Sequence, residues 1–282
     1  MSVLDAIVQD KRDELRRRRI AVPQAALRAR CRTLELARDF EEALRPATGG
    51  VRLIAEVKQA SPSRGVLAPA FDPLALARAY ARHGADAISV LTDEKYFQGS
   101  LDHLAKIRAA VEVPLLRKDF TLDEYQLWEG RAAGADAALL IVAILEPAEL
   151  RDLVAAAKGI GLAALVECHT AGEIETALGV GARLLGINNR NLDTFETRVE
   201  TTLELLPKVP PGPLVVSESG FFTGEQVRAV VAAGAHAVLV GEGLVRADDV
   251  GAKIRELKGG AASHPGRTGG EMGGASRPTH CS

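Results

Sequence analysis

Short apolar runs recur along residues 53–241, and longer amphipathic stretches separate them. The runs are unbroken rather than alternating, a pattern typical of parallel strands that are covered on both faces. In the stretches between them, such as residues 72–84 and 101–111, apolar positions recur every three or four residues, as on one face of a helix. The pattern predicts strands at Leu53–Lys58, Ala87–Leu91, Pro114–Asp119, Asp136–Ala143, Leu162–Glu167, Leu184–Asn188, Pro213–Glu218 and Ala237–Gly241.

Capping residues mark the starts of several predicted helices. Asp72 precedes Pro73, which places a capping carboxylate before a proline at the first helical position. In three further places a threonine is followed three residues later by a glutamate or glutamine, which is the spacing of a capping box. These pairs are Thr121 with Glu124, Thr170 with Glu173, and Thr223 with Gln226.

A Gly-Ala pair precedes every second predicted strand. The glycines are Gly84, Gly134, Gly181 and Gly234, so the pair recurs about every fifty residues. Each glycine suits the left-handed conformation that ends a helix before the chain enters a strand. The length of 282 residues fits either two ordinary domains or one α/β barrel. Four copies of a double strand–helix unit favour an α/β fold with a single (β/α)₈ TIM barrel. An open doubly wound sheet is the alternative, but it does not require so regular a count.

The barrel is predicted to occupy residues 51–258, between two segments of different character. Residues 259–282 are rich in glycine and contain no Val, Ile, Leu or Phe, so they are expected to be a disordered tail. Residues 1–50 are expected to form an N-terminal helical extension that packs on the barrel. An apolar stripe supports its first helix, at Val3, Leu4, Ile7, Val8 and Leu15.

Charge and cysteine usage narrow the classes of partner. The formal net charge is −2, so no global field would attract nucleic acid or a membrane surface. No apolar run approaches the roughly 18 residues that a membrane span needs. The basic run Arg16–Arg19 lies beside Asp13 and Glu14 and is interpreted as a solvated helix end. The cysteines have neither disulfide nor metal-ligand spacing, so a cytoplasmic location is expected; they are Cys31, Cys168 and Cys281.

Ionisable and amide side chains gather at the carboxyl ends of the predicted strands, where a barrel of this kind carries its active site. Burying one charge without a partner costs several kcal/mol, so charges of opposite sign would have to pair there. Each residue alone could belong to a structural ion network, whereas the whole set predicts a catalytic mouth. The set consists of Glu56, Lys58, Lys118, Glu167, Asn188, Arg190 and Glu218.

Two glycine-containing turns follow the last two predicted strands. Ser219 and Gly220 follow the seventh, and Gly241 ends the eighth. Backbone N–H groups in such turns often hold a phosphate, although an ordinary turn explains either one taken alone. The Ser61–Gly65 segment after the first strand would add donors to the same rim and is predicted to act as a flexible lid.

These side chains indicate acid–base chemistry without a metal, because no cluster in the sequence has metal-ligand spacing. A buried lysine near other cations has a lowered pKa, so it can deliver a proton or form a Schiff base. A carboxylate in the same pocket can take a proton at one step and return it at another. Cys168 and His169 are neighbours whose side chains would point to opposite faces of a strand, so both are interpreted as structural or peripheral.

Eight motifs follow one another along the chain: IAEVK (54–58), SPS (61–63), SVLTDEKYFQGS (89–100), LLRKDF (115–120), LVECHT (165–170), GINNRNLDTF (186–195), SESGF (217–221) and LVGEGLVR (239–246). In order and content they resemble the indole-3-glycerol-phosphate synthase family over roughly residues 1–258, and the glycine-rich tail lies outside this pattern.

The resemblance implies a cofactor-free step of tryptophan biosynthesis. The substrate would be 1-(2-carboxyphenylamino)-1-deoxyribulose 5-phosphate, which closes to indole-3-glycerol phosphate with loss of carbon dioxide and water. Lys118 would be the general acid, Glu167 would handle protons in the dehydration, and Lys58 would contact the substrate carboxylate. The groups that orient these side chains and the sugar hydroxyls would be Glu56, Asn188 and Glu218. The substrate phosphate would be bound by Ser61, Arg190, Ser219, Gly220 and Gly241. The pocket for the aromatic ring would be lined by Phe97 and Phe120.

Several alternatives stay open. A Schiff-base aldolase would use Lys118 as its nucleophile. Phosphoribosylanthranilate isomerase is disfavoured, because its expected cysteine–aspartate pair is replaced here by Glu56 and Lys58. A barrel that only binds a phosphorylated ligand, or that serves as a scaffold, is a third hypothesis. Which lysine gives each proton is also open, and other tryptophan-pathway enzymes are candidate partners.

Overall fold

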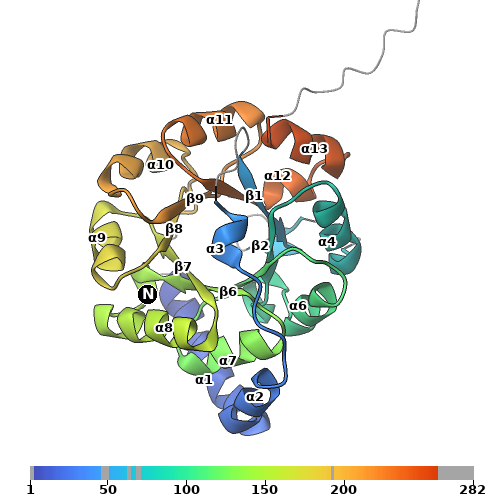
Figure 1. Ribbon diagram of the computed structural model, residues 1–282, viewed down its shortest axis with the longest axis vertical. Coiled ribbons are helices and arrows are strands. Elements are labelled where there is room, and N and C mark those ends of the chain that lie inside the picture. The colour runs from blue at the N-terminus through green and yellow to red at the C-terminus, as the bar shows by residue number, and fades with distance from the viewer. Residues whose placement is uncertain (1–2, 46–50, 62–64, 68–70, 192–193, 260–282) are drawn as a thin grey trace, which may run out of the picture.

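The computed structural model describes residues 3–45, 51–61, 65–67, 71–191 and 194–259. Eight parallel strands close into a barrel in the order β1-β10-β9-β8-β7-β6-β5-β4, and helices surround it (Figure 1). The predicted TIM barrel is therefore confirmed, and the open-sheet alternative is wrong. The barrel strands are β1 (Arg52–Val57), β4 (Ala87–Leu91), β5 (Leu115–Lys118), β6 (Ala137–Ile141), β7 (Ala163–Cys168), β8 (Leu184–Asn188), β9 (Leu214–Glu218) and β10 (Ala237–Val240).

Helices alternate with the strands along the chain. A short antiparallel pair, β2 (Ala60–Ser61) with β3 (Gly65–Val66), lies in the loop after β1. The helices after the barrel strands are α4 (Pro73–Arg82), α5 (Glu94–Phe97), α6 (Leu101–Arg108), α7 (Glu124–Ala132), α8 (Pro147–Ile160), α9 (Ala171–Gly179), α10 (Glu200–Leu205), α11 (Gly224–Ala232), α12 (Glu242–Val245) and α13 (Val250–Leu257), with 3₁₀ turns η1 (Val142–Ile144) and η2 (Leu206–Lys208).

The strands bury side chains on both of their faces, as the unbroken apolar runs predict. On β1, Leu53 and Ala55 belong to the cluster packed against the outer helices, whereas Ile54 belongs to a second cluster inside the barrel. The inner cluster also includes Phe40 of α3 (Phe40–Ala43), and Figure 1 shows that α3 lies across one end of the barrel. The barrel is thus a packed core, and its carboxyl end is left for chemistry.

Most of the predicted helix starts are confirmed. The Asp72 carboxylate accepts hydrogen bonds from the N–H groups of Leu74 and Ala75, and Thr223 and Gln226 form a complete capping box. Thr170 caps α9, but the Glu173 carboxylate accepts from the His169 backbone N–H instead of closing the box.

The predicted cap at Thr121 is wrong. Asp123 caps α7 by accepting from the Tyr125 N–H, and the helix begins two residues later than predicted. The Leu122 N–H donates to the side chain of Gln126, which holds the preceding residues in a loop. Capping residues compete for the same backbone donors, and the spacing alone does not decide between them.

The four repeated glycines adopt the predicted left-handed conformation, with φ of 91° at Gly84, 96° at Gly134, 79° at Gly181 and 116° at Gly234. At three of the four places, the residue that follows the Gly-Ala pair accepts a hydrogen bond at the amino end of the barrel. Asp86 accepts from the Leu53 N–H at 2.8 Å, Asp136 from the Leu115 N–H at 2.7 Å, and His236 Nδ1 from the Val215 N–H at 3.0 Å. These side chains satisfy backbone donors at the starts of β1, β5 and β9.

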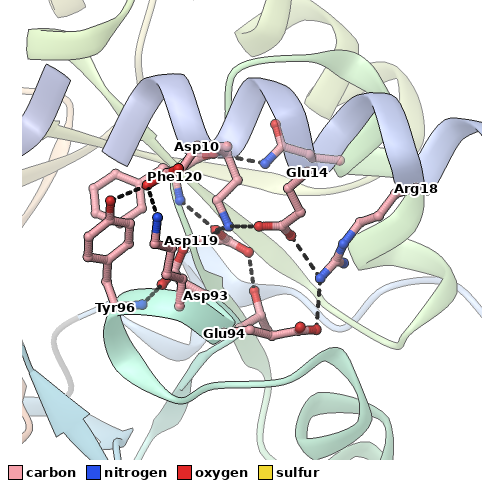
Figure 2. Close-up of polar contacts among 12 residues, drawn as sticks. Asp10, Glu14, Arg18, Asp93, Glu94, Tyr96, Asp119 and Phe120 are labelled. Atoms are coloured by element: carbon pink, nitrogen blue, oxygen red, sulfur yellow. Dashed lines mark hydrogen bonds and ion pairs between the residues drawn. The ribbon is translucent and has the colours of Figure 1, made fainter. Parts of the chain in front are cut away.

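Two further helices precede α3, namely α1 (Val3–Ala21) and α2 (Gln24–Cys31). Helix α1 contacts the barrel through a buried lysine, Lys11, whose side chain is 2% exposed. The Lys11 ammonium lies 2.8 Å from Asp93, 3.0 Å from Asp119 and 2.9 Å from Glu14. Figure 2 labels these three carboxylates. Asp93 caps α5 and Asp119 directly follows β5, so one ammonium joins α1 to two neighbouring strand ends.

The interpretation of Arg16–Arg19 as a solvated helix end is wrong for Arg18. Its side chain is 18% exposed and pairs with Glu14 at 2.8 Å, Glu94 at 3.0 Å and Glu129 at 3.1 Å. Glu94 and Glu129 are distant in sequence, so the chain pattern does not reveal them. Arg16 is 74% exposed and pairs only locally with Asp13 among the interactions of the described residues, as the interpretation expects.

Replacing Lys11 by methionine should lower the free energy of unfolding by about 3 kcal/mol, because two buried carboxylates lose their shared cation. For a barrel of this size that corresponds to a Tm lower by about 6–12 °C. Thermal unfolding followed by circular dichroism measures the shift. Arg16→Met is the control, since exposed pairs contribute about 0–1 kcal/mol. Equal Tm values for both variants would contradict the assigned role of Lys11.

Two predicted segments fall largely outside the described residues. The predicted lid includes residues 62–64, and the predicted disordered tail consists of residues 260–282 apart from Gly259. Within the described ranges, no helix has the length and apolarity that crossing a membrane requires.

Candidate active site

A cavity of about 880 Å³ opens at the carboxyl ends of the strands. Every residue that the sequence analysis assigned to the site lines this cavity. In register, Glu167 of β7 is level with Gly186 of β8, and Asn188 of β8 is level with Glu218 of β9, so the polar groups reach the mouth together. The lining residues include Glu56, Lys58, Ser61, Phe97, Lys118, Phe120, Glu167, Asn188, Arg190, Glu218, Ser219, Gly220 and Gly241.

Lys118 is at the centre of the charged groups. Its Nζ atom lies 2.8 Å from Glu167 Oε2 and 3.2 Å from Glu218 Oε2, and its side chain is 15% exposed. Burial alone would lower the pKa of Lys118, but the carboxylates of Glu167, Glu218 and Glu56 raise it above its ordinary value. The expectation of a lowered pKa is therefore wrong for Lys118, because the nearest charges are carboxylates and not cations.

The two carboxylates beside Lys118 differ in their protonation. Burial raises the pKa of Glu218 to about 7, since the attraction of Lys118 is partly offset by the repulsion of Glu167 and Glu56. Burial also acts on Glu167, but Lys118 and His169 lower its pKa below the ordinary value. Environments that push two carboxyl pKa values apart define one group that holds a proton and one that accepts it. Near neutral pH, Glu167 is the ionised member.

Glycine makes room for this pair. A Cβ atom at Gly186 would overlap Glu218 Oε1. Because glycine has no Cβ atom, the Glu218 side chain can extend from β9 across Gly186 of β8. In the sequence Gly186 is only the first residue of the motif GINNRNLDTF, and nothing in that motif indicates this role.

Glu56 and Lys58 form a second ion pair at the mouth. Glu56 lies on β1 and Lys58 directly follows it, and the distance from Lys58 Nζ to Glu56 Oε1 is 2.6 Å, so the two side chains point in the same direction, as their spacing predicts. A side chain at Gly241 would overlap Glu56 Oε1 and lie 3.0 Å from Lys58 Nζ. Gly241 therefore gives space to this ion pair, which is a contribution that the phosphate interpretation did not foresee.

The turn after β9 has a constrained backbone. Ser219 has φ of 69° and Gly220 has φ of 88°, so two consecutive residues adopt left-handed conformations. Such a conformation is costly for serine and persists where the surroundings enforce it. Here Asn189 Nδ2 donates to the Ser219 carbonyl at 3.0 Å and to Ser217 Oγ at 3.1 Å. Arg190 lies on the same side of the cavity, 3.9 Å from a carboxylate oxygen of Glu242.

Apolar side chains also line the cavity and form what we call its apolar wall. The rings of Phe97 and Phe120 lie 6.1 Å apart between centroids, at an interplanar angle of 41°. Leu4 and Ile7 of α1 line the same cavity. The apolar wall can hold an aromatic ring, whereas the ionisable side chains offer charge.

The interpretation of Cys168 and His169 is confirmed only in part. Cys168 is buried in the outer apolar cluster, so its side chain faces the helices. His169 points to the other side, and its Nε2 atom lies 3.5 Å from Glu167 Oε1. His169 therefore contacts a predicted site residue, although it does not line the cavity itself. Its position two residues after Glu167, directly after the end of β7, is the sequence signal that could have found it.

No group of three or more His, Cys, Asp or Glu side chains among the described residues is arranged to hold a metal ion. The arrangement instead offers an ammonium between two carboxylates, a second ion pair, and an apolar wall. Together the fold and the site define a (β/α)₈-barrel enzyme of the acid–base type.

Comparisons with known proteins give the family. The family model described as "Indole-3-glycerol phosphate synthase" matches residues 4–257. The chain is 52% identical over 268 residues to the indole-3-glycerol phosphate synthase of Roseiflexus sp. (strain RS-1), covering 92% of this chain and 99% of the relative. It is 49% identical over 257 residues to that of Burkholderia ambifaria (strain ATCC BAA-244 / DSM 16087 / CCUG 44356 / LMG 19182 / AMMD), covering 90% and 98%. The chain belongs to the indole-3-glycerol phosphate synthase family.

Solved structures at lower identity share the fold alone. A 3-hexulose-6-phosphate synthase aligns with a TM-score of 0.60 and 18% identity, over 73% of this chain and 98% of that chain. The N-acetylmannosamine-6-phosphate 2-epimerase from Clostridium perfringens aligns with a TM-score of 0.59 and 16% identity, over 76% and 94%.

Proposed function

We propose that Lys118 is the general acid of the ring closure that gives this family its name. The chain acts on a phosphorylated small molecule, 1-(2-carboxyphenylamino)-1-deoxyribulose 5-phosphate, and is a carboxy-lyase of tryptophan biosynthesis. The observation that carries the proposal is the Lys118 ammonium, which lines the cavity and lies within 2.8 Å of Glu167 and 3.2 Å of Glu218. An ammonium in this position is a proton donor aimed at whatever carbonyl oxygen enters the mouth.

Ring closure begins when the ring carbon that bears the carboxylate attacks the ketose carbonyl carbon. A carbon–carbon bond forms, the carbonyl π bond breaks, and Lys118 gives its proton to the oxygen. The ring nitrogen is then iminium-like, so the electron pair of the carbon–carboxylate bond has an acceptor when carbon dioxide leaves. The apolar wall of Phe97 and Phe120 holds the ring and excludes water from this intermediate.

Dehydration completes the indole ring. The new hydroxyl leaves as water with a proton from Lys58 or Lys118, and Glu167 takes the proton that the ring loses as it becomes aromatic. Glu167 is suited to this step because its pKa is lowered by Lys118 and His169, which keeps the carboxylate ionised. Glu56, Asn188 and Glu218 orient these groups.

The remaining site residues would bind the two ends of the substrate. Lys58 contacts the carboxylate of the anthranilate ring before it is lost. Ser219, Gly220 and Gly241 offer backbone donors to the phosphate, and the strained turn at Ser219 fits a role in binding an anion. Ser61 and Arg190 line the same cavity and supply further donors to the phosphate.

A Schiff-base aldolase is the second candidate function, and the charge around Lys118 disfavours it. Schiff-base formation requires a neutral amine, whereas three carboxylates raise the pKa of Lys118 and hold it protonated.

Neither a cofactor nor a metal is part of the proposal. We also place the enzyme in the cytoplasm on the basis of its cysteine usage, with other tryptophan-pathway enzymes as candidate partners.

Incubation of the full chain with the carboxyphenylamino substrate, without added metal, tests the proposed function. The expected result is a rise in indole fluorescence accompanied by release of carbon dioxide. Borohydride treatment in the presence of substrate should leave Lys118 unmodified. A covalent adduct on Lys118, or no fluorescence with folded protein, would reject the proposal in favour of the aldolase or of a binding barrel.

A further inference from the structure

The Glu167 carboxylate has a second neighbour that lies outside the cavity. Lys118 contacts Glu167 Oε2 from the cavity side, and His169 Nε2 faces the other oxygen, Oε1, at 3.5 Å. His169 is not among the residues that line the cavity. Any effect of His169 on the substrate must therefore pass through Glu167.

Glu173, in the first turn of α9, contacts both the backbone and the ring of His169. Its Oε2 atom accepts from the His169 backbone N–H at 2.7 Å and lies 3.2 Å from the ring Nδ1 atom. The ring is fixed at both its backbone and its Nδ1 atom, and the side chain is 13% exposed. Fixed in this way, the ring presents Nε2 to Glu167.

The buried Nε2 atom has no hydrogen-bond partner among the residues that the structure describes. If Nδ1 carries the proton toward Glu173, a neutral imidazole would direct the Nε2 lone pair at the Glu167 carboxylate, which is repulsive. An imidazolium donates to Glu173 on one side and toward Glu167 on the other. A shortening of the 3.5 Å distance by a few tenths of an ångström would complete the second hydrogen bond.

We propose that His169, held by Glu173, is a positioning residue that fixes the Glu167 carboxylate and keeps it ionised for proton transfer. This inference rests on the proposed role of Glu167. The charged and polar groups that face Glu167 are Lys118 from β5, Asn188 from β8, Glu218 from β9 and His169. Burial lowers the pKa of His169, but Glu173, Glu167 and Glu218 together raise it, which agrees with an imidazolium at this place.

Substitutions at His169 separate this role from a merely structural one. Asparagine keeps a group near the position of Nδ1 and removes Nε2, so His169→Asn should lower kcat about tenfold and leave KM within about twofold. Loss of the cation raises the pKa of Glu167, so less of it is ionised at low pH, and the acidic limb of the kcat profile should move to higher pH by about one pH unit. Glutamine retains a donor near Nε2 but carries no charge, so His169→Gln should recover most of kcat at neutral pH while the acidic limb stays at the higher pH.

Cys168→Ala is the matched control, because Cys168 is adjacent in sequence and faces the outer helices. It should lower Tm and leave the pH profile unchanged. An unchanged kcat and pH profile in His169→Asn would overturn the inference, as would a change in Tm with no change in the profile.

An NMR titration of the His169 ring in the full chain keeps this test independent of turnover. The signal, assigned by its loss in His169→Asn, should titrate above the ordinary histidine pKa, and Glu167→Gln should lower that value. If the titration depends on Glu167 but the enzyme does not form indole, the proposed function fails and the pair stands. If His169 titrates as an ordinary histidine in an active enzyme, only the inference fails.

Discussion

Replacing Lys118 by methionine should lower kcat by a factor of about 10³ to 10⁴ while changing KM little. The methionine side chain fills the same space but carries no proton to the carbonyl oxygen. Lys118 lies within 2.8 Å of Glu167 and 3.2 Å of Glu218, so its loss also removes the cation that keeps Glu167 ionised. Steady-state kinetics with indole fluorescence as the signal measure the effect, and the loss is read as lost transition-state stabilisation.

Lys158→Met is the control for this variant, because Lys158 lies exposed on α8. It should have the kcat of the unaltered enzyme. A Lys118→Met variant that retains turnover would refute the assignment of Lys118 as the general acid.

The Glu167→Gln variant should lose a factor of about 10² to 10⁴ in kcat. Glutamine preserves the shape of the side chain and can still accept a hydrogen bond from Lys118, but it cannot take the proton that the ring releases. Since Glu167 raises the pKa of Glu218, that pKa should also fall in the variant. Kinetics across the pH range, compared with Glu175→Gln on the exposed face of α9, measure both effects. Wild-type kinetics in Glu167→Gln would exclude its role in dehydration.

The arrangement of the barrel could be predicted from local pattern because each strand is buried on both faces and each repeat ends in a left-handed glycine. The candidate residues could also be found, since the carboxyl ends of parallel strands meet at one mouth. Placement in one cavity was therefore predictable for Lys118 and Glu167, although their chemical roles stay predictions.

Interactions between elements far apart in the chain could not be predicted. The direction of the Lys118 pKa depends on which charges cross the barrel to reach it, and those come from β1, β7 and β9. Arg18 meets Glu94 and Glu129 only once α1 has packed. The contribution of Gly186 depends on a side chain of the next strand, which no pattern within β8 reveals.

The side chains of Asp86, Asp136 and His236 tie the strand starts at the end of the barrel opposite the catalytic mouth. These hydrogen bonds therefore contribute to stability at a distance from the residues that line the cavity. Stabilising substitutions at the amino ends of the strands should therefore raise heat tolerance without altering the site. Conversely, the loops at the carboxyl ends can be redesigned for a new substrate while these hydrogen bonds are kept.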